Sequence, residues 1–192
     1  MAKYFQPNSG MPRSLMKPGD ILINTSTFKP AHCGIVVEDH YVIHATSDGI
    51  LMDYLDLWQN EAEIFRPTAE LGKDELTKVT GIAREIKNSA TYGMLRAGFK
   101  STFSSGSVGT GLQKRLEKYR ERLKNHQGVV KHVYCSELVI LCYQLGFPTD
   151  RHRLFIDLDG KHTWPSTLRR YLKGTIHWTH LGELVPQANA GR

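Results

Sequence analysis

The chain has only three cysteines and no long apolar run. Cys33, Cys135 and Cys142 are too few and too irregularly spaced for a disulfide framework or for a CxxC zinc site. No stretch approaches the length of a membrane span, and residues 1–20 lack the apolar core of a secretory signal. We therefore expect a protein without a transmembrane segment that is cytoplasmic at synthesis.

Acidic residues are in the minority. The 192 residues carry 25 Lys and Arg against 19 Asp and Glu, which gives a formal net charge of +6. Much of the excess lies in residues 114–131, where Glu117 and Glu121 interleave with the basic side chains and Tyr119 is the single aromatic. This pattern favours the solvated face of a helix over a nucleic-acid interface, so we expect no nucleic-acid partner.

The length fits one domain. We expect a single domain over residues 1–185 and a disordered tail over residues 186–192. Residues 98–111 are rich in Gly and Ser, as in a linker or a mobile loop. With the basic helix that follows, residues 98–131 read as an insertion or a lid.

Short β-type segments dominate the first third of the chain, and helical periodicity follows. The sequence predicts an α+β fold with a central antiparallel sheet. The expected strands are 21–23, 35–37, 41–45, 50–52, 63–66 and 175–181, and the expected helices are 73–88, 112–125, one starting at Cys135 and one starting near Pro165.

Cys135 stands at the start of the apolar run Cys135–Leu145, which is long enough for a buried helix. Ser136 and Glu137 suit a first helical turn, since serine can cap backbone amides and an acid complements the helix dipole. A thiol at a helix N-terminus has a lowered pKa, and the thiolate is the nucleophile. The alternative is a small buried side chain, which free cysteine usually is.

Two histidines flank a predicted hairpin. His32 and His44 are twelve positions apart (44 − 32). If the turn centres on Glu38, they lie directly opposite each other on one face of the sheet. If the turn centres on residues 39–40, they meet only diagonally or through a bulge.

These residues can carry nucleophilic catalysis. Thiol hydrolysis needs a thiolate, an imidazole that forms an ion pair with it, and a third polar group that orients the imidazole. Cys135, His32 and His44 can fill these roles in that order. Two imidazoles and a thiolate would also suit zinc, and the protein would then be a metal-binding module without enzymatic activity.

Four motifs together resemble a known family. They are Gly19-Asp20-Ile21-Leu22, His32-Cys33-Gly34-Ile35-Val36, Val42-Ile43-His44-Ala45 and Tyr134-Cys135-Ser136-Glu137-Leu138-Val139. In this order they are similar to the circularly permuted branch of the NlpC-type papain-fold cysteine peptidases, which includes YiiX/YaeF-like proteins and the lecithin:retinol acyltransferases. The element that begins at Trp164-Pro165 also resembles one that these proteins carry near the end.

The resemblance implies a papain-like domain with the Cys135 helix packed on the sheet. It assigns Cys135 as the nucleophile, His32 as the base and His44 as the orienting residue, without a cofactor or a metal. Cys142, two turns deeper, is expected in the core, and strand alternation points Cys33 away from His32.

The implied activity is cleavage of an amide bond in a peptide or cell-wall substrate through an acyl-enzyme. Export by a dedicated secretion system, with an immunity protein as partner, would bring an antibacterial effector to such a substrate. The alternative is a thiol acyltransferase or lipid amidase.

Overall fold

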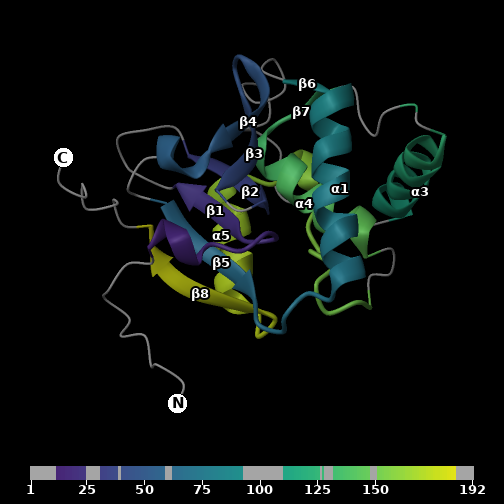
Figure 1. The fold of residues 1–192 in the computed structure, drawn as a ribbon. Coiled ribbons are helices and arrows are strands. Elements are labelled where there is room, and N and C mark those ends of the chain that lie inside the picture. Colours follow the sequence, from purple (N-terminus) through teal and green to yellow (C-terminus); the bar gives the residue numbers. More distant parts are fainter. Residues whose placement is uncertain are drawn as a thin grey trace.

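A six-stranded antiparallel sheet forms the centre of the molecule (Figure 1). The computed structural model describes residues 12–24, 31–38, 40–58, 62–92, 110–125, 127, 132–147 and 151–184. The strand order is β4-β3-β2-β1-β5-β8. The strands are β1 (Ile21–Asn24), β2 (His32–Glu38), β3 (Tyr41–Thr46), β4 (Gly49–Tyr54), β5 (Ala62–Pro67) and β8 (Trp178–Glu183). The expected α+β fold with an antiparallel sheet is confirmed.

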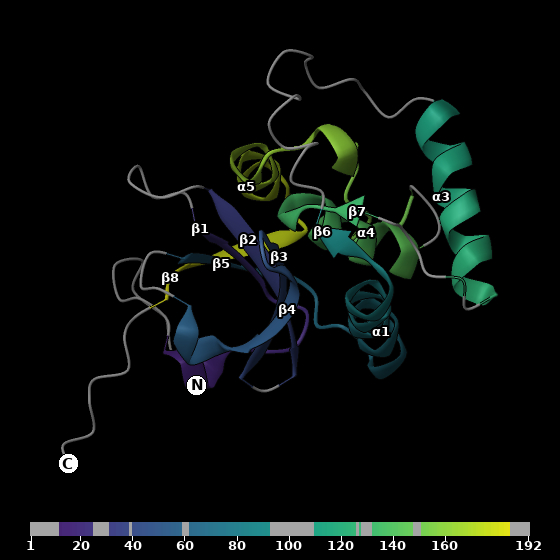
Figure 2. The ribbon, with the colours of Figure 1, turned by 90° about the horizontal axis from the view of Figure 1, so that it is seen from above.

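Helices cover one face of the sheet. Seen from above, α1 (Lys73–Ser89), α4 (Cys135–Gly146) and α5 (Pro165–Gly174) lie on the same side, and α3 (Thr110–Lys124) lies outside them (Figure 2). Every residue of α4 is buried, including the polar Ser136, Glu137 and Gln144. The amphipathic α1 instead buries one stripe, which includes Val79, Ile82 and Ile86.

The opposite face of the sheet carries a second, smaller apolar cluster. It combines strand residues such as Leu22 and Val42 with Trp58, which follows the 3-10 helix η2 (Leu55–Leu57). Strand side chains alternate between the two faces, so consecutive residues of β2 belong to different clusters. This alternation decides which side chains can meet at the site.

Two short strands pair in parallel beside the main sheet. β6 (Thr91–Tyr92) pairs with β7 (His132–Val133), a contact that the sequence did not predict. The pairing brings together the two ends of the segment that contains residues 98–131. Residues 98–109 and the predicted tail at 186–192 lie outside the described part of the chain, so the lid and the tail stay predictions.

The basic helix buries its apolar side and exposes many of its charges. Leu112, Leu116 and Tyr119 join the main core, and the guanidinium of Arg115 forms an ion pair with Asp159 at 2.5 Å. This matches the predicted solvated face. Among the described helices, none is both long enough and apolar enough to cross a lipid bilayer.

A buried carboxylate on the sheet forms ion pairs with α5. Glu63 on β5 accepts hydrogen bonds from Arg169 Nε and Nη2 at 2.5 and 2.6 Å and from Lys173 Nζ at 3.0 Å. These bases hold the pKa of Glu63 below its usual value, although burial opposes the shift. The ion pairs fix α5, and with it the loop that contacts the start of α4.

Candidate active site

Cys135 is the first residue of α4. Tyr134 before it is extended, with φ −116° and ψ 173°, so the helix begins sharply at the cysteine. The N–H of Leu138 donates to Tyr134 O at 2.9 Å, and the N–H groups of Cys135 and Ser136 therefore have no acceptor within the helix. The Cys135 thiol lies where backbone dipoles favour negative charge.

Ser136 does not cap α4, contrary to the sequence-based expectation. Its hydroxyl instead donates to the carbonyl oxygen of Thr163 at 2.5 Å, and the helix start has no side-chain cap. The bond ties the first turn of α4 to the segment that leads into α5. The residue next to Cys135 thus positions the start of α4.

The hairpin of β2 and β3 adopts the second of the two predicted registers. Glu38 pairs with Tyr41, so the turn lies between these two residues, and the register shifts between Val36 and Glu38. His44 then stands opposite Gly34, and His32 is its diagonal neighbour on the same face.

A chain of hydrogen bonds joins three side chains from three neighbouring strands. His32 Nε2 lies 2.8 Å from His44 Nδ1, and His44 Nε2 lies 2.9 Å from Asp53 Oδ2 on β4. Asp53 pairs with Val42 in the ladder and therefore shares the face of His44. The structure thus brings together the two predicted histidines and adds a carboxylate beyond them.

The carboxylate determines the tautomers in this chain. Asp53 can only accept, so His44 donates from Nε2–H. Burial lowers the pKa of His44, more than the hydrogen bond to Asp53 raises it. A neutral His44 has an unprotonated Nδ1, which accepts the Nε2–H of His32. This assignment follows from the hydrogen-bond network, and it leaves Nδ1 of His32 for the thiol.

Cys33 and His32 both lower the pKa of the Cys135 thiol. The influence of Cys33, and then that of His32 and its charge, hold this pKa well below its ordinary value, whereas burial opposes the shift. Cys135 is 8% exposed. A thiol whose pKa is lowered by a neighbouring imidazole has the character of an activated nucleophile.

Trp58 covers the two imidazoles. Its ring stacks on His32 at a centroid distance of 5.3 Å and meets His44 edge-on at 5.3 Å. Gly34 makes room for this packing, because a Cβ there would lie 2.9 Å from Trp58 Cζ2 and 3.0 Å from His44 Cβ. Glycine is thus required by close approach at this position.

We expect Gly34→Ala to displace Trp58 and His44. The rigid strand and the buried ring cannot move without cost, and overpacking costs about 1–3 kcal/mol. Thermal unfolding should show this loss, and Cys135 alkylation at acidic pH should slow. Gly81→Ala in α1 is the matched control, since nothing lies within 4 Å of its added Cβ and it should stabilise by roughly 0.5–1 kcal/mol. Equal unfolding temperatures for the two variants would contradict the steric argument.

The arrangement does not suit a shared metal ion. Two nitrogens bound to one tetrahedral zinc ion are about 3.3 Å apart, whereas His32 Nε2 and His44 Nδ1 are 2.8 Å apart and face each other. No cluster of three or more His, Cys, Asp or Glu with metal-binding geometry is found among the residues that the structure describes. The geometry favours a hydrogen-bonded relay over the metal-binding alternative.

Sequence reasoning missed Asp53, Trp58 and the role of Cys33. Asp53 directly follows the predicted apolar strand Ile50–Met52. Its side chain lies on the same face of the sheet as His44, which is apparent only once the β3–β4 register is known. Because side chains alternate along β2, Cys33 points away from His32, as expected. It points into the main apolar cluster, which also contains Cys135. Trp58 gave no local signal, because a single tryptophan after a short helical segment fits any core.

Comparison of the chain with protein-family models, with curated proteins and with solved structures found no match. What the site does is therefore argued from its residues and their geometry.

Proposed function

We propose that the protein is a cysteine hydrolase that cleaves amide bonds, with Cys135 as nucleophile, His32 as base and acid, and His44 as the orienting residue. The observation that carries the proposal is the hydrogen-bonded chain from His32 through His44 to Asp53, together with the effect of His32 in lowering the pKa of Cys135. A circularly permuted, NlpC-type papain-like fold is part of this proposal. The helix that starts at the cysteine and the strands that carry the histidines support it.

Acylation begins with attack by the Cys135 sulfur on the carbonyl carbon of the substrate. The oxygen becomes negative, and the N–H groups at the start of α4 can stabilise it, as in an oxyanion hole. His32, protonated on Nδ1 after taking the thiol proton, passes that proton to the leaving amine. The bond that breaks is the amide C–N bond, and the bond that forms is a thioester at Cys135.

Deacylation uses the same residues in reverse. His32 Nδ1 takes a proton from a water molecule, and the resulting hydroxide attacks the thioester carbon. The thiolate leaves and the His32–Cys135 ion pair is restored. His44 keeps His32 in orientation through both steps, and Asp53 keeps His44 in the tautomer that accepts from His32 Nε2–H.

Peptide stems or cross-links of bacterial cell wall are the substrate class that we propose. The resemblance to NlpC-type peptidases motivates this choice, and the net charge of +6 suits stem peptides, which are acidic. Delivery to a wall would involve a dedicated secretion system, and a chain used as an antibacterial effector would have an immunity protein as partner.

Digestion of purified cell wall tests the proposal. Wild type should release soluble stem fragments from at least one wall type, with new amino groups visible after chromatography and mass spectrometry. Cys135→Ala should release none, because no other thiol can form the acyl-enzyme. Cys142→Ala, which changes a fully buried cysteine two turns deeper in α4, should retain activity. Blank chromatograms for wild type across several wall chemistries would contradict this substrate class.

The acyl donor separates the peptidase from the alternative. A thiol acyltransferase or lipid amidase would form the same thioester at Cys135 but start from an acyl lipid. Incubation with short-chain ester lipids, followed by mass spectrometry of the intact protein, would show an acyl adduct on Cys135 if the lipid reading holds. Cell-wall hydrolysis without such an adduct would favour the peptidase.

A further inference from the structure

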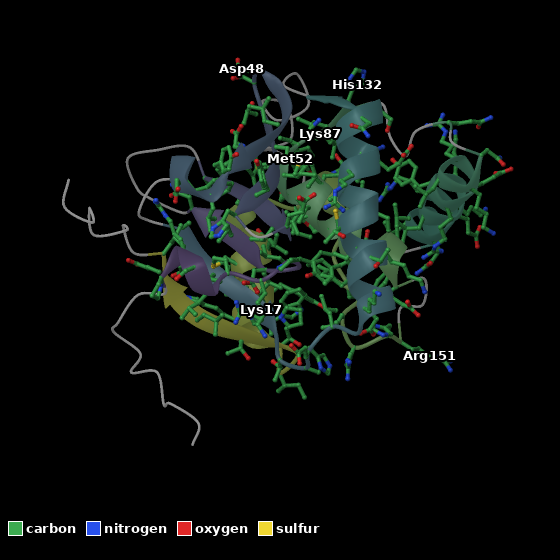
Figure 3. All side chains as sticks on the ribbon, viewed as in Figure 1. Lys17, Asp48, Met52, Lys87, His132 and Arg151 are labelled. Atoms are coloured by element: carbon green, nitrogen blue, oxygen red, sulfur yellow. The ribbon has the colours of Figure 1, made fainter. Side chains whose placement is uncertain are left out.

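A cavity of about 460 Å³ lies at the end of the sheet away from the two histidines. It is bounded by the turn before β1, the end of β5, the segment after β5 and the first turn of α1. The N–H of Val36 donates to Asp20 O, so the cavity adjoins the Val36 end of β2, whereas His32 begins that strand roughly 13 Å away. Figure 3 shows Lys17 at this end and Asp48, in the β3–β4 hairpin, at the other. The cavity is therefore separate from the candidate active site.

Buried hydrogen bonds hold one wall of the cavity in place. In the turn before β1, Gly19 has φ 90°, and Tyr143 on α4 donates its hydroxyl hydrogen to Gly19 O. Asp20, which is 1% exposed, accepts from Lys17 N at 2.8 Å and from Arg66 Nε and Nη2 at 2.7 and 2.6 Å. The Arg66 guanidinium is thus fixed before a ligand arrives. A preformed site binds without the cost of ordering its own side chains.

Two cations of the lining, Arg66 and Lys17, have N–H donors left for a ligand. Arg66 donates from Nε and Nη2 to Asp20, and from Nη2 also to Leu15 O at 2.8 Å. Within the part of the chain that the structure describes, Arg66 Nη1 has no acceptor. Lys17 Nζ donates to Glu70 Oε1 at 3.2 Å, and an ammonium has two further donors. The cavity therefore offers a place for a carboxylate.

The charges of the lining balance, which favours a zwitterion over a simple anion. Lys17 and Arg66 are offset by Asp20 and Glu70. The Lys17 ammonium and the Glu70 carboxylate lie 3.2 Å apart at the rim, and both side chains are more than half exposed. An α-amino acid likewise carries its ammonium and its carboxylate close together, on one carbon atom. The rest of the lining is mainly apolar, from Pro18, Pro67, Leu71 and Leu76.

We propose that this cavity binds a free α-amino acid with an apolar side chain. The ligand carboxylate accepts from Arg66 Nη1 and Lys17 Nζ, and the ligand ammonium donates to Glu70. The ligand side chain packs on Leu71 and Leu76, which are half-buried in the free protein. The volume lies within the range of small-ligand sites, roughly 300–1,000 Å³. This binding is independent of the proposed hydrolysis.

Titration of L-leucine into isotope-labelled protein, followed by NMR, tests the inference. The backbone amide signals of Gly19, Asp20 and Leu71 should shift and saturate, whereas those of His44 and Cys135 should stay in place. Three matched probes each lack one group: N-acetyl-L-leucine has no ammonium, L-leucinamide has no carboxylate and glycine has no side chain. Each should bind about tenfold more weakly or worse, because hydrogen bonds to charged groups and apolar burial both contribute to affinity.

Variants at the exposed rim give the second measurement. Lys17→Gln and Glu70→Gln should each weaken L-leucine binding about tenfold, whereas Lys124→Gln and Glu121→Gln, the same changes at exposed positions of α3, should bind as wild type. Unchanged affinity in Lys17→Gln and Glu70→Gln, equal binding of N-acetyl-L-leucine, or no shifts at millimolar L-leucine would overturn the inference. Cys135→Ala should bind L-leucine as wild type does, so blank wall digests would contradict the proposed substrate and leave this site standing.

Discussion

Replacing His32 with alanine is expected to slow alkylation of Cys135 at pH 6 by about 10-fold or more. In wild type, Cys33 and then His32 keep the pKa of Cys135 low against the opposing effect of burial. Without the imidazole, its hydrogen bonding and its positive charge are lost and only Cys33 still opposes burial, so the pKa of Cys135 rises. Each unit of that rise lowers the thiolate fraction in acid about tenfold.

The sign of the pH dependence follows from the thiolate. Labelling falls as pH drops below the pKa of Cys135, so a depressed pKa keeps wild type reactive in acid, whereas the labelling curve of His32→Ala should move to higher pH. Iodoacetamide labelling with peptide mapping measures both curves. His177→Ala, which changes a histidine in the turn before β8, is the matched control. Superimposable curves for wild type and His32→Ala would show that the imidazole does not set the charge of the thiol.

Asp53→Asn is expected to lower kcat by about 10²- to 10⁴-fold, with a smaller effect on KM. The carboxylate can only accept, whereas the amide can turn its N–H₂ toward His44 Nε2 and donate. His44 would then carry its proton on Nδ1 and face the Nε2–H of His32, so the relay would be broken. Loss of tautomer control behind a catalytic imidazole has an effect of this size in serine proteases.

Asp53 acts through His44, so its test needs more than activity. The pH profile of alkylation should shift in Asp53→Asn, whereas thermal unfolding should change little, because the substitution preserves size. Asp53→Glu keeps an acceptor-only group and should recover part of the rate. Asp48→Asn is the matched control, since Asp48 projects from the tip of the β3–β4 hairpin (Figure 3). Full activity of Asp53→Asn would show that Asp53 is not needed and that the essential residues are Cys135, His32 and His44.

Local patterns predicted the elements, and long-range pairing decided the site. The apolar run after Cys135 and the stripe in α1 correctly gave two helices, because their periodicity is written in consecutive residues. The sequence allowed two registers for the β2–β3 hairpin, and the structure has the one in which Glu38 pairs with Tyr41. A one-residue slip changes which side chains share a face, and hydrophobicity at Val36 and Val37 is equal in both registers.

What the sequence did not predict depends on contacts between distant segments. Asp53 reaches His44 only because β4 pairs with β3 in a specific register, and the parallel β6–β7 pair joins residues some forty positions apart (132 − 91 = 41). Cys33 and Cys135 join one apolar cluster only because α4 docks on β2. None of these arrangements leaves a signal in a single stretch of sequence.

The order of the parts along the chain has a consequence for synthesis. His32, His44 and Asp53 lie on neighbouring hairpin strands near the N-terminal end, whereas Cys135 comes more than eighty residues later, and β8, which covers the edge of β5, comes last. Domains form as the chain leaves the ribosome from the N-terminal side. A nascent chain therefore carries the two histidines and Asp53 before Cys135 has been made, and the proposed reactive site is complete only when the final third of the chain has docked on these strands.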